Sequence, residues 1–83
     1  MKVQGTINKY PQKIEVGEQV LIGEFGQPLD VQPWAREVAK AQFKKVVKIA
    51  EMKWREKPAR RIVFEDGTEA VMLTIHKLIV KVK

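Results

Sequence analysis

The segment from Trp34 to Arg55, WAREVAKAQFKKVVKIAEMKWR, constrains the fold most, because its apolar residues fit two different periods. Placed at about 100° per residue, most of them fall on one half of a helical wheel and most charged residues on the other. A strand over residues 43–51 instead puts Lys45 on the same face as Phe43 and Val47. The helical pattern accommodates more residues and predicts one long amphipathic helix. Its buried face is expected to hold Val38, Phe43, Val46, Val47, Ile49 and Ala50.

Two segments before the helix and one after it show strand patterns. Residues 2–9 alternate apolar and polar side chains, and residues 13–25 form a second apolar stretch with a bend at Gly17. Asp30 is a suitable N-cap for the helix that follows. These patterns predict an α+β fold in one domain, residues 1–83, with the order ββαββ(β). In this fold class an antiparallel sheet is packed by one long amphipathic helix.

The stretch 59–82 gives the clearest β pattern. Asp66-Gly67 lies between two alternating runs and predicts a hairpin with a two-residue turn, which pairs Phe64 with Glu69. The apolar parity changes after Ile75, so a bulge or tight turn is expected at His76-Lys77.

A second fold remains open from the sequence, a small SH3-like β-barrel of five strands. In that alternative, residues 43–52 form a strand and Asp66-Gly67 is the distal turn. His76-Lys77 then lies in the short turn before the last strand.

The positive charge of the chain is concentrated in one segment. Residues 34–63 carry ten Lys and Arg against three acids, a net +7, whereas residues 1–33 sum to −1 and residues 64–83 to 0. In the helical interpretation Lys40, Lys44 and Lys48 form a row one turn apart, and Glu51 pairs with Arg55. Such a surface favours a polyanionic partner or an acidic protein surface.

Little in the composition points to catalysis. The chain has no cysteine and no serine, and His76 is its only histidine, so no nucleophile–base set is apparent. Glu65, Asp66 and Glu69 cluster at the Asp-Gly turn, but a cation site normally needs more oxygen ligands than these. We therefore expect no enzyme activity, no catalytic residues, no cofactor and no metal.

Two functional hypotheses follow from the charge. The first is a non-enzymatic protein that binds RNA, or DNA with little sequence preference, through the helix and its junction with the hairpin. Its contact residues would be Lys40, Lys44, Lys45, Lys48, Lys53, Trp54, Arg55, Lys57, Arg60 and Arg61. The second is a small regulatory or inhibitory protein that docks on an acidic partner protein, with Trp34 or Trp54 as anchor. Both tryptophans are more often core residues in such positions, and we expect them there.

The sequence also bears on the location of the chain in the cell and on its oligomeric state. No stretch has the roughly 20 apolar residues of a membrane span, and the N-terminus lacks the apolar run of a signal peptide. A cytoplasmic protein without a membrane span is therefore expected. A domain of 83 residues has a limited core, so stabilisation through a homodimer or through a partner is left open.

Overall fold

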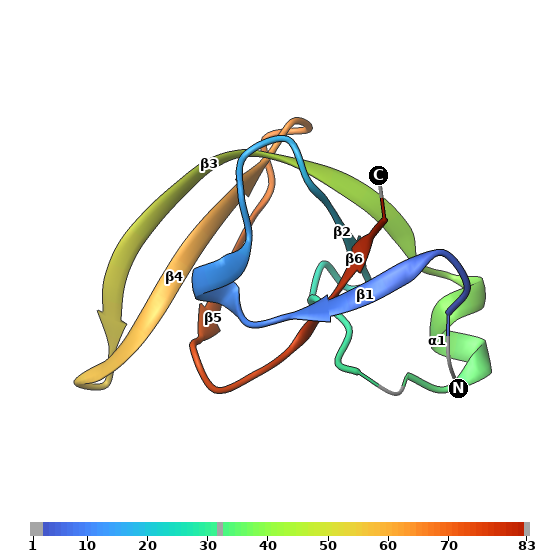
Figure 1. The fold of residues 1–83 in the computed structure, drawn as a ribbon, viewed down its shortest axis with the longest axis horizontal. Helices are drawn as coiled ribbons and strands as arrows, with labels where there is room; N and C mark the ends of the chain where they lie inside the picture. Colours follow the sequence, from blue (N-terminus) through green and yellow to red (C-terminus); the bar gives the residue numbers. More distant parts are fainter. Residues whose placement is uncertain (1–2, 32, 83) are drawn as a thin grey trace.

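The computed structural model describes residues 3–31 and 33–82, and these form a mostly β domain (Figure 1). Its elements in chain order are strand β1 (Thr6–Lys9), the 3-10 helix η1 (Pro11–Lys13), strand β2 (Gln19–Ile22), helix α1 (Ala35–Ala39), and strands β3 (Gln42–Trp54), β4 (Lys57–Phe64), β5 (Glu69–Leu73) and β6 (Leu78–Lys81). All six strands join one antiparallel sheet in the order β1-β6-β2-β3-β4-β5. The sheet is open, with β1 and β5 at its edges.

The predicted fold class is wrong, because no long amphipathic helix packs on this sheet. The only α-helix among the described residues is α1, of five residues, and most of the predicted helix is the 13-residue strand β3. Trp34, rather than Asp30, precedes the first helical turn, and its backbone N–H donates to Glu37 Oε2 at 3.1 Å. The helix then stops, because Lys40 already leaves helical backbone angles and a strand begins at Gln42.

A β-bulge explains why this strand has a helix-like pattern. Val46 pairs with Phe64 and Lys48 with Val63, so Val47 is the extra residue. The inward-facing apolar residues Val46 and Ile49 are thereby three positions apart, which is a helical spacing and not a strand spacing.

The strand β3 also buries apolar residues on both of its faces. Before the bulge, Phe43 packs against a small cluster on one side of the sheet. Val46 belongs to the main core on the other side. A helical wheel gathers such residues on one face, although the strand separates them.

The predicted hairpin after Pro58 exists, but its register differs by one residue. Val63, not Phe64, pairs with Glu69. The N–H of Gly67 donates to the carbonyl of Phe64, and the N–H of Phe64 donates to the carbonyl of Thr68. Gly67 has a φ of 87°, so the loop is a three-residue turn with a left-handed glycine and not the two-residue type I′ turn.

Other predicted features occur with shorter bounds. Strand β1 covers the second half of the predicted strand 2–9, whose residue 2 lies outside the described residues. Strand β2 covers part of 13–25, and Gly17, with a φ of 98°, lies in the turn before it. The bulge or tight turn predicted at His76-Lys77 is a turn that lies earlier, over Thr74–His76, and it separates β5 from β6.

The alternative with an SH3-like barrel anticipated several local features. Residues 43–52 are indeed strand, and turns lie at Asp66-Gly67 and just before β6. The closed barrel is not what the sheet forms, since β1 and β5 remain unpaired edges of six strands.

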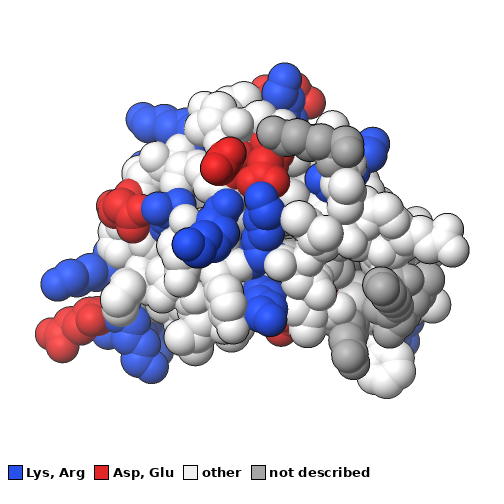
Figure 2. Space-filling model, viewed as in Figure 1, with Lys and Arg blue, Asp and Glu red and all other residues white. Residues whose placement is uncertain are grey.

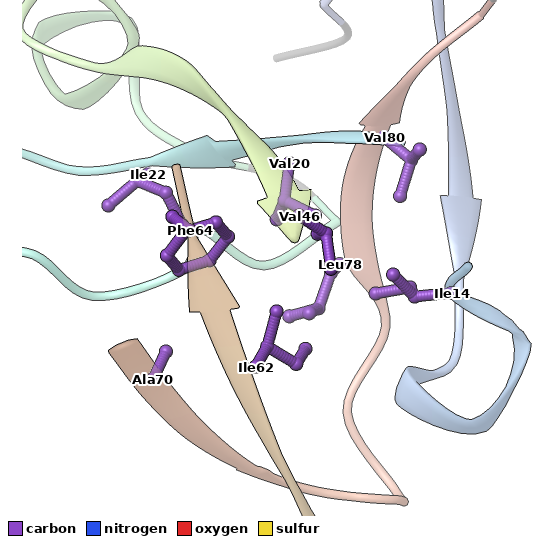
Figure 3. Packing of buried hydrophobic residues seen from close by; sticks show 9 residues of the cluster. All are labelled: Ile14, Val20, Ile22, Val46, Ile62, Phe64, Ala70, Leu78 and Val80. Atoms are coloured by element: carbon purple, nitrogen blue, oxygen red, sulfur yellow. The ribbon is translucent and has the colours of Figure 1, made fainter. Parts of the chain in front are cut away.

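The sheet curves around its main hydrophobic core, so side chains from both halves converge (Figures 1 and 3). This first cluster contains Ile14, Val20, Ile22, Val46, Ile62, Phe64, Ala70, Leu78 and Val80. A second, smaller cluster of Leu21, Leu29 and Ile79 lies on the opposite face of β2 and β6, together with Phe43 of β3. None of the helices formed by the described residues has the length and apolar content to span a bilayer.

Candidate nucleic-acid interface

The longest hairpin of the molecule, β3–β4, carries most of the predicted site residues. Its strands pair from Val46–Phe64 to Trp54–Lys57, and Figure 1 shows its turn at the end of the molecule away from α1. The turn consists of Arg55 and Glu56, both with positive φ, 49° and 65°. This is the geometry of a two-residue type I′ turn, so the predicted junction between helix and hairpin is the tip of a β-ribbon.

One side of β3, β4 and β5 faces away from the first cluster, and we call it the outer face. Ile49, Ile62 and Phe64 point inward, so the alternation of side chains places their neighbours outward. The outer face therefore carries Lys45, Lys48, Ala50, Met52, Trp54, Lys57, Ala59, Arg61, Val63, Glu69, Val71 and Leu73.

Four of the ten predicted site residues are held by ion pairs. Lys40 Nζ lies 3.7 Å from Glu24 Oε2, and it is an exposed residue at the end of α1. Arg61 donates from Nε and Nη2 to Glu69 Oε2, at 2.9 and 2.7 Å, across β4 and β5. These two cations are already partly neutralised by neighbouring carboxylates.

Lys44 and Arg60 are structural residues. The Lys44 side chain is only 12% exposed, and its Nζ lies 2.9 Å from Asp66 Oδ2 and 3.0 Å from Thr68 Oγ1. Arg60 pairs with Glu51 across the hairpin, and its Nη1 donates to the carbonyl of Pro11 at 3.2 Å. Both groups therefore serve contacts within the chain, and Arg60 Nε is buried without a hydrogen-bond partner among the described residues.

The hydrogen bonds at the Asp66 turn also set the charge of its carboxylate. Thr68 donates to Asp66 Oδ1 from its hydroxyl, at 2.6 Å, and from its backbone N–H, at 3.0 Å. The Thr68 hydroxyl and then Lys44 hold the pKa of Asp66 well below its ordinary value of 3.8. The acidic turn thus stabilises the fold, because Asp66 forms an ion pair with Lys44 and Glu69 forms one with Arg61.

Five predicted cations form no ion pair with any described residue: Lys45, Lys48, Lys53, Arg55 and Lys57. Lys45, Lys48 and Lys57 share the outer face, whereas Lys53 alternates to the other side of the hairpin. The predicted row of Lys40, Lys44 and Lys48 does not exist, because the three residues belong to different surfaces.

Seen from one side, Figure 2 shows Lys and Arg gathered mainly over the half of the molecule that holds the β3–β4 hairpin, interspersed with Asp and Glu. The half near α1 is mostly free of charged atoms in this view. On the face that this view shows, the positive charge is therefore unevenly distributed.

Both tryptophans are exposed, contrary to the expectation that they belong to the core. Trp54 is 51% exposed at the end of β3, and the guanidinium of Arg55 lies 5.9 Å from its ring centre. Trp34 is 71% exposed beside α1, at the other end of the molecule. Each exposed tryptophan has a cation nearby: Arg55 lies over the ring of Trp54, and Arg36 lines a small hollow together with Trp34.

The sequence did not reveal the apolar hollow next to Trp54. Val71, Met72, Leu73 and His76 line it together with Trp54, and its volume is about 350 Å³. These residues come from β3, from the edge strand β5 and from the turn that follows. A correct hairpin register would have placed Val71 and Leu73 on the face of Trp54, because Leu73 pairs with Ala59 and Ala59 with Met52.

Comparison with protein-family models, with curated proteins and with solved structures finds no match for this chain.

Proposed function

We propose that this chain is a non-enzymatic nucleic-acid-binding protein whose contact surface is the outer face of β3, β4 and β5. One observation carries the proposal: Lys45, Lys48 and Lys57 share this face without ion partners among the described residues, and exposed Trp54 pairs with Lys57 at its end. Arg55 at the turn adds a further free cation.

The spacing of these cations suits a polyanion. Lys57 pairs with Trp54, six residues along β3 from Lys48, so the backbone positions of the two lysines lie about 20 Å apart along the strand direction. A phosphate backbone supplies repeated charges over such a length, and neutralising it releases counterions, which drives binding. RNA and DNA both provide this backbone.

Docking on an acidic protein surface is the second candidate, and a separate observation favours it. Phe25, 87% exposed, and Trp34, 71% exposed, lie near α1. A hollow of about 340 Å³ there is lined by residues that include Arg36 and Lys40 together with Glu24 and Glu37. Exposed aromatic residues next to cations are typical of protein interfaces. This surface is distinct from the outer face.

The test is a fluorescence anisotropy titration of labelled RNA and DNA with the unmodified chain and two double variants. The double variant Lys48→Glu/Lys57→Glu removes two outer-face cations. Its matched control, Lys13→Glu/Arg36→Glu, changes the net charge equally at exposed residues outside that face. Each titration is repeated from about 50 to about 200 mM salt, where phosphate contacts lose affinity steeply.

We expect the outer-face variant to bind at least about tenfold more weakly and to show a shallower dependence on salt, by about 0.7 per lost contact with a single strand. The control should stay close to the unmodified protein. Equal losses in both variants would mean that only the net charge matters and would contradict the proposed face. Retention of an acidic protein by the chain, without any binding of nucleic acid, would favour the second candidate.

A further inference from the structure

The hollow beside Trp54 is open at the edge of the sheet. Its walls are the Trp54 ring, three residues of β5 and His76, and β5 is the last strand of the sheet. Its volume of about 350 Å³ lies within the range of small-molecule sites, roughly 300 to 1,000 Å³. An apolar hollow of this kind favours a flat, largely apolar group over water.

Cations stand around this hollow on the same face. Lys57 pairs directly with Trp54 and has no ion partner among the described residues, whereas Arg61, which pairs with Val71, is held by Glu69. Arg55 lies over the Trp54 ring. The group that enters the hollow should therefore belong to a molecule with negative charge close to a flat apolar part.

We propose that this hollow binds an unpaired nucleobase stacked on Trp54, so that the preferred ligand is single-stranded nucleic acid. The inference rests on the proposed function and adds the form of the ligand. In a duplex each base is stacked and paired, so reaching the hollow would first require its extrusion. A single strand has free base faces, and cationic surfaces with aromatic side chains bind such strands with little sequence preference. His76 adds a polar group to a wall that could contact the edge of the base.

The experiment compares three ligands of about 12 nucleotides: a single strand, the duplex of the same sequence, and a single strand in which abasic residues replace the central bases. Each is titrated with the unmodified chain, with Trp54→Leu and with the matched control Trp34→Leu. In a Trp34→Phe background, Trp54 is the only tryptophan, so its emission reports stacking directly.

We expect the single strand to bind about tenfold more tightly than the duplex and than the abasic strand. Trp54→Leu should weaken the single strand by about tenfold, since stacking on an aromatic residue contributes this much per base. The same change should leave the duplex affinity nearly unchanged, and Trp34→Leu should have no effect on any ligand. We also expect the single strand to quench the emission of Trp54, and the duplex and the abasic strand to leave it unchanged.

The outcomes separate this inference from the proposed function. Equal affinity for all three ligands, still lost in Lys48→Glu/Lys57→Glu, would overturn the stacked base and leave the phosphate-binding face intact. Absence of binding to every ligand at low salt would overturn both. The abasic strand and the quenching need no Leu variant, so the inference stays testable if Trp54→Leu does not fold.

An acidic peptide with an aromatic residue is the competing occupant, because it also combines negative charge with a flat ring. If such a peptide displaces the single strand at equal concentration, and the chain shows no preference between single strand and duplex, a nucleobase is not the occupant of the hollow.

Discussion

At the scale of single residues, the most unusual positions are Arg55 and Glu56 at the tip of the β3–β4 hairpin. Both have positive φ, which costs a residue with a side chain roughly 1–2 kcal/mol. Type I′ turns normally contain Asn, Asp or Gly at these positions. The chain thus places a cation, Arg55, where glycine or asparagine would be more stable, next to the tryptophan that we assign to binding.

The tip therefore offers a stabilising substitution. Glu56→Gly should raise the free energy of unfolding by about 1 kcal/mol, because glycine adopts positive φ without a steric cost. Thermal unfolding should then move up by about 4–8 °C for a domain of this size. The opposite change, Gly67→Ala at a φ of 87°, should lower the unfolding temperature by a similar amount. A lower unfolding temperature for Glu56→Gly would contradict the left-handed turn.

Asp66 makes stability depend on acid pH. Its pKa is lowered in the folded chain, so its carboxylate stabilises the fold above the ordinary value of 3.8, and this contribution is lost as the pH falls below it. The unfolding temperature of Asp66→Asn should lie below that of the unmodified chain at neutral pH, and the difference should shrink below pH 3.8. Glu65→Gln, on the same turn, is the control for removing a charge. A difference that stays constant with pH would contradict the lowered pKa that the Thr68 hydroxyl and Lys44 give to Asp66.

At the scale of elements, β3 shows both the success and the limit of the sequence interpretation. The segment was expected to be one long amphipathic helix with a single buried face. It is mostly a long strand, with Val46 and Phe43 on opposite faces of the sheet. The bulge at Val47 moves Ile49 to a helical distance from Val46. Pairing with β2 and β4 decides whether this segment is a helix or a strand. The sequence of the segment alone therefore could not reveal that it is a strand.

The candidate site was predictable as a region and not as a set of residues. The charged segment and exposed cations such as Lys48 were found from the sequence. Which cations are free depends on cross-strand neighbours, and Lys44 meets Asp66 far along the chain. The hollow beside Trp54 depends on the β4–β5 register, which a three-residue loop shifts by one position.

Strand β4 provides a test that separates structure from binding. Arg60 holds η1 through the carbonyl of Pro11 and pairs with Glu51, so Arg60→Ala should cost about 1–3 kcal/mol of stability. Under conditions where the variant is folded, its affinity for nucleic acid should stay within about twofold. Lys48→Ala should behave conversely, with stability changed by less than about 0.5 kcal/mol and weaker binding. Chemical denaturation and anisotropy titrations measure the two quantities, and weaker binding in Arg60→Ala equal to that in Lys48→Ala would contradict the assignment.

At the scale of the whole molecule, the two faces of the curved sheet have different roles. The inner face holds the first cluster, to which both halves of the sheet contribute (Figure 3). The outer face is covered at β2 and β6 by the second cluster, which includes Leu29 of the loop before α1. Over β3, β4 and β5 the outer face is partly exposed. Trp54, Val71 and several cations are exposed there, whereas Ala59 is buried. Exposed apolar area rimmed by charge is typical of an interaction surface.

We propose that nucleic acid contacts the outer face of β3, β4 and β5 and not the surface near α1. The most direct measurement is a proton–nitrogen correlation spectrum of the isotope-labelled chain, recorded while a single-stranded oligonucleotide is added. The chain has two tryptophans, so the two indole N–H signals report on the two ends of the molecule. We expect the Trp54 indole signal and the amides of Lys48 and Val71 to shift, while the Trp34 indole signal stays in place. Shifts centred on Trp34, or none at saturating oligonucleotide, would contradict the account.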